Sequence, residues 1–366
     1  MRRRPTLLIA LFALFAGLLL GGTVVAVAAP KDPCDKLFSK STTAKLKAYT
    51  ACREDRQDAT LKRIESQLAA LATPGTAPRP STPTSSPTSS PSPTSSPTSS
   101  PTSSPTQPPS GDAAPAGAAN TGVPDGTRLT AYTGPSTITT AGTVIDAKKI
   151  SSCLVIKADN VTIKNSLLQS NACFFNVLAD NGNTGLKLTD VEIDGQGNKA
   201  GDSAVNGGGY TCLRCDVHGT IDGFKAGTGV TIKDRWIHDL AMTADSHNDG
   251  IQSLGTTRLT IAGNTIVLAD GATSAVILST GSASDMRNVT ITDNLLGGGA
   301  FTVYGGYAAG RDNKAKISDI AVTDNRFSTK IHPTSGAFGP LTSADSPVVV
   351  SGNTWADGPN AGKPVG

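Results

Sequence analysis

Residues 230–237 read V-T-I-K-D-R-W-I, and close copies of this segment recur through the second half of the chain. Residues 161–168 read V-T-I-K-N-S-L-L, and residues 289–296 read V-T-I-T-D-N-L-L. Apolar and polar residues alternate at the start of each copy, which indicates a strand with one buried face. Eight such segments begin at Val161, Leu186, Tyr210, Val230, Leu259, Val289, Ile320 and Val348. Their starts lie 20 to 31 residues apart, a loose period that is typical of stacked supersecondary units.

A second short apolar run belongs to each unit, for example residues 154–156 and 276–278. No window after residue 120 has the sustained spacing of a helix. Because a single coil cannot bury its own inward side chains, units of this kind are stable only when stacked. The pattern therefore predicts an all-β domain over residues 121–366, a right-handed parallel β-helix of about eight to nine coils. We expect one inner stack to consist of Ile163, Leu188, Cys212, Ile232, Ile261, Ile291, Val322 and Val350.

The bend after the first strand has the same residue type in four consecutive coils. These residues are Asn264, Asn294, Asn325 and Asn353. Asn tolerates unusual backbone conformations, and its amide can bond to the equivalent amides above and below. We expect a structural amide ladder here. The aspartates that recur just before this position, Asp190, Asp234, Asp293 and Asp324, are also expected to be structural.

The first 120 residues differ from the repeats in composition. Residues 1–30 hold three arginines and then an uncharged run, which is the layout of a signal peptide or, if uncleaved, a signal anchor. Residues 31–72 contain Cys34 and Cys52 and a 3-4-3 apolar spacing, which predicts a small helical segment. This segment is either a short coiled coil or a hairpin closed by a disulfide. Residues 73–120 are rich in Pro, Ser and Thr and predict a disordered, extended linker.

This layout predicts an extracytoplasmic protein, secreted or held at the cell surface, with membrane contact only through an uncleaved N-terminal segment. Residues 1–80 contain 13 Lys and Arg against 6 Asp and Glu, whereas residues 121–366 contain 19 against 22. The basic residues therefore belong to the N-terminal part, and the repeat domain has no basic stripe that would match a phosphate backbone. We expect no nucleic-acid partner.

The remaining four cysteines lie in the repeat domain. Cys153 and Cys173 open equivalent runs one coil apart, so stacking should bring them within bridging distance. Cys212 and Cys215 form a C-x-x-C motif, which can indicate a redox or zinc site. No second pair and no helix-rich context accompany it. A local bridge, or two stacked small apolar residues, is the favoured interpretation.

Four stretches carry a resemblance to a known group of proteins. They are V-P-D-G-T-R-L-T-A-Y-T-G-P from Val123, H-G-T-I-D-G-F-K-A-G from His218, W-I-H-D-L from Trp236 and S-H-N-D-G-I-Q-S from Ser246. From residue 122 to residue 366 the sequence resembles actinobacterial secreted right-handed β-helix proteins of the pectate-lyase-like superfamily. The resemblance implies the fold and a polysaccharide partner. It does not fix the reaction, because this superfamily includes uronate lyases, polygalacturonases, epimerases and proteins with no known reaction.

The motifs of the polygalacturonase-like members are N-T-D, D-D, G-H-G and R-I-K. This chain has only a partial echo of the first, in residues 247–250. Pectate-lyase-like members use an acidic calcium site and a catalytic Arg or Lys, and no motif of this chain places such a set.

Two histidine-containing segments in consecutive coils form the candidate site. His218 and His238 fall at the same repeat position, and Asp222 and Asp249 follow them by four and eleven residues. A seven-residue insertion, residues 242–248, makes the difference. Function is often carried by loops added to a rigid scaffold. Stacking should pair Asp222 with Asp249, Lys225 with Gln252 and His218 with His238.

The patch fits β-elimination of a uronate in an acidic polysaccharide. Asp222, Asp245 and Asp249 could hold Ca²⁺, a hard cation that takes oxygen ligands. A lysine or arginine could instead pair directly with the uronate carboxylate, and a histidine could remove the proton. The expected catalytic residues are Asp222, Lys225, Arg235, His238, His247 and Asp249.

Substrate-binding residues are expected in the same patch and in one later connection. They are His218, Asn248, Gln252, Tyr304, Tyr307 and Arg311, with the aromatic rings serving as a sugar-stacking platform. Two alternatives stay open. One is a glycoside hydrolase that uses Asp222 and Asp249 as its carboxyl pair. The other is a non-catalytic envelope protein that binds glycan, in which D-G marks a turn and the two histidines form a structural stack.

Overall fold

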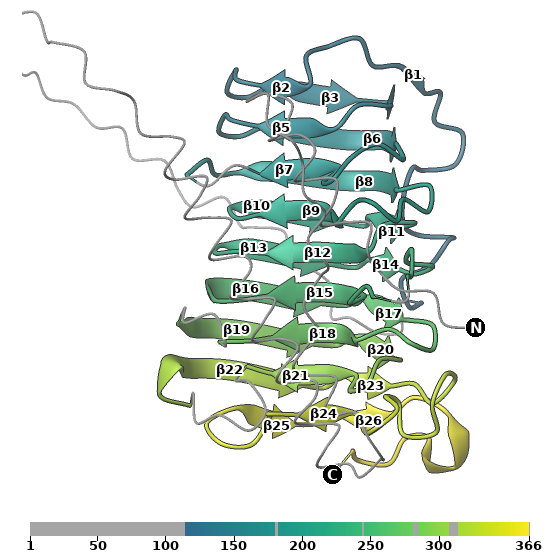
Figure 1. Ribbon diagram of the computed structural model, residues 1–366, viewed down its shortest axis with the longest axis vertical. Helices are drawn as coiled ribbons and strands as arrows, with labels where there is room; N and C mark the ends of the chain where they lie inside the picture. The colour runs from purple at the N-terminus through teal and green to yellow at the C-terminus, as the bar shows by residue number, and fades with distance from the viewer. Residues whose placement is uncertain (1–113, 180–181, 244, 281–284, 307–313, 366) are drawn as a thin grey trace, which may run out of the picture.

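The computed structural model describes residues 114–179, 182–243, 245–280, 285–306 and 314–365. In this part of the chain the backbone winds into a parallel β-helix whose coils stack along one axis (Figure 1). The predicted fold class is confirmed. Strands from successive coils pair in parallel along two long sheets, which we call sheet A and sheet B.

Sheet A has 17 strands, because most coils contribute two short strands separated by a bend. Its strands are β1 (Thr130–Ala131), β3 (Val144–Asp146), β4 (Lys148–Ile150), β6 (Thr162–Gln169), β8 (Leu186–Asp194), β10 (Tyr210–Leu213), β11 (Asp216–His218), β13 (Val230–Lys233), β14 (Trp236–Ile237), β16 (Thr256–Ala262), β17 (Thr265–Val267), β19 (Met286–Thr292), β20 (Leu295–Gly297), β22 (Ile317–Thr323), β23 (Arg326–Phe327), β25 (Val349–Ser351) and β26 (Thr354–Trp355).

Sheet B has 9 strands, one from each coil that it crosses. They are β2 (Thr137–Ile138), β5 (Leu154–Ile156), β7 (Val177–Ala179), β9 (Ser203–Gly207), β12 (Asp222–Ala226), β15 (Asp249–Ser253), β18 (Ser274–Leu278), β21 (Val303–Gly305) and β24 (Leu341–Thr342). Two short 3₁₀ turns, Lys314–Lys316 and Gly358–Asn360, complete the regular structure of the described residues.

The predicted repeat register is confirmed. In sheet A, Cys212 lies opposite Ile232, Ile232 opposite Ile261, and Ile261 opposite Ile291. All four side chains are fully buried. The core is therefore a set of apolar columns parallel to the axis, in which each coil covers the apolar face of the previous one.

The amide ladder at the bend is also confirmed. Nδ2 of Asn264 donates to Oδ1 of Asn294 over 2.8 Å, and Asn294 donates in the same way to Asn325 over 2.8 Å. Asn325 donates to Asn353 over 3.0 Å. Each amide oxygen also accepts the backbone N–H of the equivalent residue in the preceding coil, as Asn294 does from Asn264.

The unusual backbone conformation at this bend lies one residue earlier than expected. Asp234, Asp293 and Asp324 have φ angles of 56°, 57° and 57°, in the left-handed region. Asp and Asn are the non-glycine residues that enter this region most readily. An aspartate makes the turn before Asn294 and Asn325, and a glycine with a φ of 67° or 68° makes it before Asn264 and Asn353. In each case the asparagine side chain bonds along the stack.

Two disulfides close in the repeat domain. Cys153 bridges to Cys173 in the next coil, with the two Cα atoms 5.4 Å apart, as predicted. Cys212 bridges to Cys215 across one bend, so of the interpretations of C-x-x-C the local bridge is the one observed. Disulfides are typical of proteins outside the reducing cytoplasm. The Cys34–Cys52 bridge, the helical segment and most of the linker lie outside the described residues.

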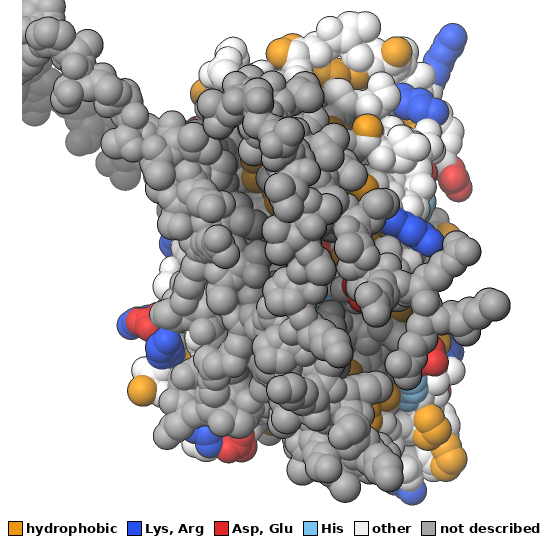
Figure 2. Space-filling view, viewed as in Figure 1, with side chains coloured by type: hydrophobic (Ala, Val, Ile, Leu, Met, Phe, Trp, Pro, Cys, Tyr) orange, Lys and Arg blue, Asp and Glu red, His pale blue; other side chains and the backbone are white. Residues whose placement is uncertain are grey.

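The side chains of described residues that are visible in Figure 2 include both basic and acidic ones. None of the helices in the described ranges is long and apolar enough to cross a membrane.

Replacing Asn294 with alanine should strongly destabilise the domain. Its amide makes bonds to the backbone and side chain of Asn264, to the carbonyl oxygen of Ile261 and to the side chain of Asn325. Loss of these buried bonds is expected to lower the free energy of unfolding by about 3–5 kcal/mol. Chemical denaturation measures the change. The control is Thr290→Ala, at a partly exposed position of the same coil. Equal, small losses in the two variants would contradict a stabilising ladder.

Candidate functional site

Asp222 and Asp249 occupy the first positions of neighbouring strands in sheet B. Strand β12 begins at Asp222 and β15 at Asp249, and their register places Lys225 opposite Gln252. The backbone N–H of Asp249 donates to Oδ1 of Asp222 over 2.9 Å. The predicted pairing of these residues between coils is confirmed.

The glycine after each aspartate lets the two coils approach closely. A Cβ atom on Gly223 would lie 2.3 Å from the carbonyl oxygen of Gly250 and 2.9 Å from Cγ2 of Ile237. Both glycines lie within strands, so the D-G sequence is not a turn here. Gly223 and Phe224 both face the core. The residues on either side of them, Asp222 and Lys225, therefore both point to the outer side of β12, where their side chains approach each other.

Lys225 pairs with two carboxylates, one from its own strand and one from the residue before β9. Its Nζ lies 2.6 Å from Oδ2 of Asp202 and 3.6 Å from Oδ2 of Asp222. The side chains of Lys225 and Asp202 are 19% and 20% exposed, whereas Asp222 and Asp249 are 2% and 0% exposed. Asp202 was missed in the sequence. Asp222 lies opposite Ser203, the first residue of β9, and Asp202 immediately precedes Ser203. Aligning β9 with β12 in the sequence would therefore have indicated Asp202.

Asp249 is held by two side chains. Oγ of Ser274, from the next coil, donates to its Oδ1 over 2.5 Å, and Nε2 of Gln252 donates to its Oδ2 over 3.2 Å. Ser274 is the register partner of Asp249 and was also missed. At the other end of the group, Oδ1 of Asp202 and Oγ of Ser203 are buried without a hydrogen-bond partner among the described residues. We call Asp202, Asp222, Lys225, Asp249, Gln252 and Ser274 the acidic cluster.

The electrostatics of the acidic cluster favour a proton on one carboxyl. Burial raises the pKa of Asp222 well above its ordinary value, Lys225 lowers it, and the charges of Asp249 and Asp202 raise it further. One ammonium group among three carboxylates cannot balance all of them. A carboxyl group that keeps its proton, as the raised pKa of Asp222 favours, can act as a general acid.

The inserted loop is tied to the same corner of the fold. Nδ2 of Asn248 donates to the carbonyl oxygens of Ile221 and Ala241 over 2.6 and 3.0 Å. Its Oδ1 accepts from Ser246 over 2.7 Å, so this amide, predicted to bind substrate, fixes the loop to the preceding coil. Asp245 is exposed in the loop, and His247 is partly exposed.

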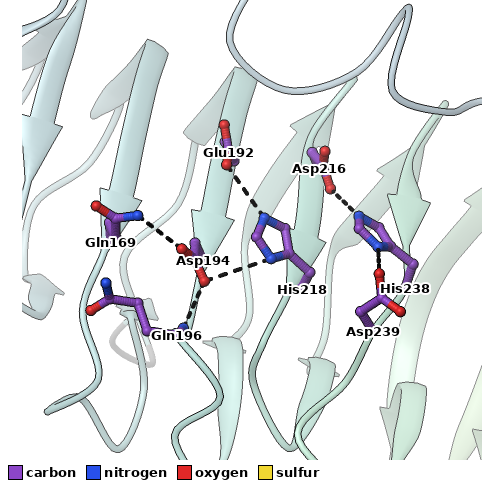
Figure 3. Close-up of polar contacts among 8 residues, drawn as sticks. All are labelled: Gln169, Glu192, Asp194, Gln196, Asp216, His218, His238 and Asp239. Atoms are coloured by element: carbon purple, nitrogen blue, oxygen red, sulfur yellow. Dashed lines mark hydrogen bonds and ion pairs between the residues drawn. The ribbon is translucent and has the colours of Figure 1, made fainter.

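His218 and His238 belong to a different face from the acidic cluster. They lie on sheet A, at the end of β11 and just after β14, with ring centroids 5.1 Å apart in the predicted stack. His218 contacts Glu192 at 3.3 Å and Asp194 at 3.6 Å. Figure 3 shows these carboxylates and Asp216 around the two rings. The single patch expected from the sequence is therefore two groups of residues on two sheets.

The second histidine has its own pair of carboxylates. Nε2 of His238 lies 2.9 Å from Asp216 and its Nδ1 lies 2.7 Å from Asp239 (Figure 3). The Trp236 ring stacks on His238 with centroids 3.5 Å apart. We call His218, His238, Glu192, Asp194, Asp216 and Asp239 the imidazole row. The segment before β1 crosses beside it, because the N–H of Gly122 donates to the carbonyl oxygen of Arg214 over 2.9 Å.

The carboxylates favour the charged form of both imidazoles. The hydrogen bond to Glu192 raises the pKa of His218, and burial opposes it. Burial acts to lower the pKa of His238, but the hydrogen bonds to Asp216 and Asp239 outweigh it, so the net direction is also upward. Neither histidine contacts the acidic cluster through a hydrogen bond among the described residues.

Two other predicted residues, Arg235 and Tyr304, belong to neither group. Arg235 is fully buried in the interior of the coil, so it is not placed to meet an external polysaccharide. Tyr304 is 4% exposed and packs against Phe301. Tyr307 and Arg311 lie outside the described residues.

A groove crosses the coils where sheet B passes into sheet A, and its volume is about 870 Å³. Its lining combines glycines, threonine hydroxyls and one guanidinium: Gly182, Asn183, Thr184, Gly185, Gly208, Gly209, Tyr210, Thr211, Gly227, Thr228, Gly229, Val230, Thr231, Gly255, Arg258 and Thr260. The glycines keep the corner tight, since a Cβ on Gly209 would lie 2.6 Å from the carbonyl oxygen of Asn183. This groove was not expected from the sequence.

Among the described residues, no three His, Cys, Asp or Glu side chains form a group that could hold a metal ion. Comparison of the chain with protein-family models, with curated proteins and with solved structures finds no match.

The imidazole row should make stability depend on pH in a defined direction. Because folding raises both histidine pKa values, the stabilisation is fully present below the unfolded value of about 6.5 and is lost as the pH rises through the folded values. In His238→Gln, the deficit in unfolding midpoint relative to wild type should be largest at low pH and shrink at high pH. Gln169→Ala removes a neutral partner of Asp194 and should give a constant deficit. A pH-independent deficit in His238→Gln would contradict the ion pairs.

Proposed function

We propose that this chain is an exported β-helix protein that acts on a polysaccharide, with its chemistry at the acidic cluster. The observation that carries the proposal is the pairing of Asp222 and Asp249 from adjacent coils beside the Lys225 ammonium. The predicted signal segment and the two disulfides support an extracytoplasmic location. The resemblance to secreted pectate-lyase-like proteins supports a polysaccharide partner.

The charges of the acidic cluster favour hydrolysis over elimination. Elimination of a uronate needs a cation that faces the substrate carboxylate, and Lys225 already lies 2.6 Å from Asp202. The cluster holds three carboxyl groups and one ammonium group, so its acidic groups outnumber its cation. An anionic sugar is therefore repelled unless Ca²⁺ bridges the charges, and the elimination hypothesis retains this requirement.

In the hydrolytic scheme, Asp222 is the general acid and Asp249 the base or nucleophile. The raised pKa of Asp222 keeps a proton on it at a pH where an ordinary aspartate has lost it. That proton passes to the glycosidic oxygen as the bond to the sugar breaks. Asp249, oriented by Ser274 and Gln252, activates water or attacks the sugar carbon. Asp222 and Asp249 are buried, and Lys225 and Asp202 are the more exposed members of the cluster, so the scheme requires these two side chains to move aside for a sugar to reach the pair.

A second candidate function is glycan binding without cleavage, and the groove favours it. Its floor of glycine backbone and threonine hydroxyls can bond to sugar hydroxyls, and Arg258 is a single exposed cation at its side. The low exposure of Asp222 and Asp249 also fits this alternative, in which the acidic cluster is a structural ion network.

Activity on a panel of neutral and acidic polysaccharides tests the first function. Wild type should release reducing ends, and Asp222→Asn and Asp249→Asn should each lower the rate by about 10²–10⁴-fold, as expected for loss of an acid or base. Asp293→Asn, at an exposed bend, is the matched control. Elimination is recognised by an unsaturated, ultraviolet-absorbing product that depends on Ca²⁺. Full activity in both cluster variants would rule out the proposed site, and an inactive wild type would leave glycan binding as the function.

Binding measurements test the second function. Arg258→Gln should weaken binding of an acidic polysaccharide by roughly two- to fivefold at low salt, because one exposed ion pair is lost. Binding of a neutral polysaccharide should be unchanged. The comparison is Arg326→Gln, which removes an exposed arginine outside the groove. An equal effect of the two substitutions would show that the groove is not the binding surface.

A further inference from the structure

Arg235 stands where the next four coils have asparagine. Its backbone N–H donates to Oδ1 of Asn264 over 3.1 Å, so its main chain continues the amide ladder. Its side chain does not. It is the largest fully buried side chain in the described part of the fold. The ladder therefore ends at a charged group inside the coil.

The guanidinium lies among rings rather than carboxylates. Its Cζ atom is 5.6 Å from the centroid of the Phe224 ring. The Tyr210 ring stacks on the same Phe224 with centroids 6.4 Å apart. Within the described residues, Nε, Nη1 and Nη2 of Arg235 have no hydrogen-bond partner, and neither has the hydroxyl of Tyr210. Two buried donor groups thus flank one aromatic ring.

No carboxylate compensates this charge in the described residues. Asp234, the neighbour in sequence, affects Arg235 electrostatically, but its carboxylate makes no hydrogen bond to the guanidinium nitrogens. Its Oδ1 instead lies on the bend, where a Cβ on Gly263 would meet it. Burial lowers the pKa of Arg235 well below its ordinary value, yet a guanidinium starts so far above neutrality that it keeps its proton.

The ring alone does not balance the cost of burying this cation. Attraction to one aromatic face offsets only a minor part of the lost hydration of a charged group. A guanidinium offers five N–H donors and no acceptor, and the phenol offers one more donor. A group that completes this site has to be small, to accept hydrogen bonds only, and to carry negative charge.

We propose that a monovalent anion of chloride size binds inside the coil, with the guanidinium of Arg235 and the hydroxyl of Tyr210 as its donors. An anion held there is enclosed by the coil, because Tyr210, Phe224 and Arg235 are at most 1% exposed. A water molecule can accept hydrogen bonds but brings no charge. The anion is then a structural part of the fold, independent of the proposed action on polysaccharide.

Thermal unfolding of the full-length chain tests the site. Chloride is exchanged for gluconate, which is too large to enter, at constant ionic strength. The wild-type midpoint should rise by about 3–6 °C for each tenfold increase in chloride above the dissociation constant. Arg235→Asn should remove this dependence, and the asparagines of the next four coils show that the bend accepts the residue. Tyr210→Phe should weaken the dependence without abolishing it.

The exposed Arg326→Gln is the control for general effects of chloride and should keep the full wild-type dependence. Equal midpoints of wild type in chloride and gluconate would overturn the proposal. So would an unchanged chloride dependence in Arg235→Asn.

A second measurement needs no variant that might fail to fold. Crystals of wild-type protein grown with bromide in place of chloride should show an anomalous scattering peak beside the Arg235 guanidinium. A crystal with bromide at surface positions and none beside Arg235 would overturn the proposal.

Discussion

The parallel stacking of one coil on the next is the constraint on which the rest of the structure depends. A single turn of this chain has inward side chains with nothing to cover them, so it gains stability only from its neighbours. Stacking fixes the register, and the register decides which side chains meet. The amide ladder, the disulfide from Cys153 to Cys173 and the contact of Asp222 with Asp249 all join residues at equivalent positions of consecutive coils. The candidate sites are therefore products of the repeat and of small departures from it.

Sequence reasoning was most successful where the repeat itself decides the answer. The inner column from Ile163 to Val322 could be read from the sequence because a slip of one residue would turn every apolar side chain outward. Val350 keeps the predicted register opposite Val322, but its side chain is exposed rather than buried. The same logic paired Lys225 with Gln252 and stacked His218 on His238. Aligning the coils in the sequence does not show on which sheet a residue lies. Only three residues lie between His218 and Asp222, and one of them, Gly219, has a φ of 68° where the chain turns from one sheet to the other.

The other differences also come from three-dimensional effects. The left-handed position at the bend is one residue before the asparagines, because the ladder needs the asparagine side chains inside. Asp202 and Ser274 were not singled out, since neither stands near an unusual motif, and only the register brings them to Lys225 and Asp249. One stretch of chain thus contains two contrasting cations. Lys225 pairs with two carboxylates, whereas Arg235, ten residues later, lies over the ring of Phe224.

The last coil shows how such a stack can be brought to an end. Residues 362–365 return antiparallel along β26: the N–H of Gly362 donates to the carbonyl oxygen of Trp355, and the N–H of Trp355 donates to that of Lys363. The N–H of Val365 donates in turn to the carbonyl oxygen of Asn353. These bonds occupy the edge of β26 that a further parallel coil would use. Residues 362–365 therefore occupy the hydrogen-bonding groups on this edge of β26. A strand from a second molecule cannot pair with the same groups.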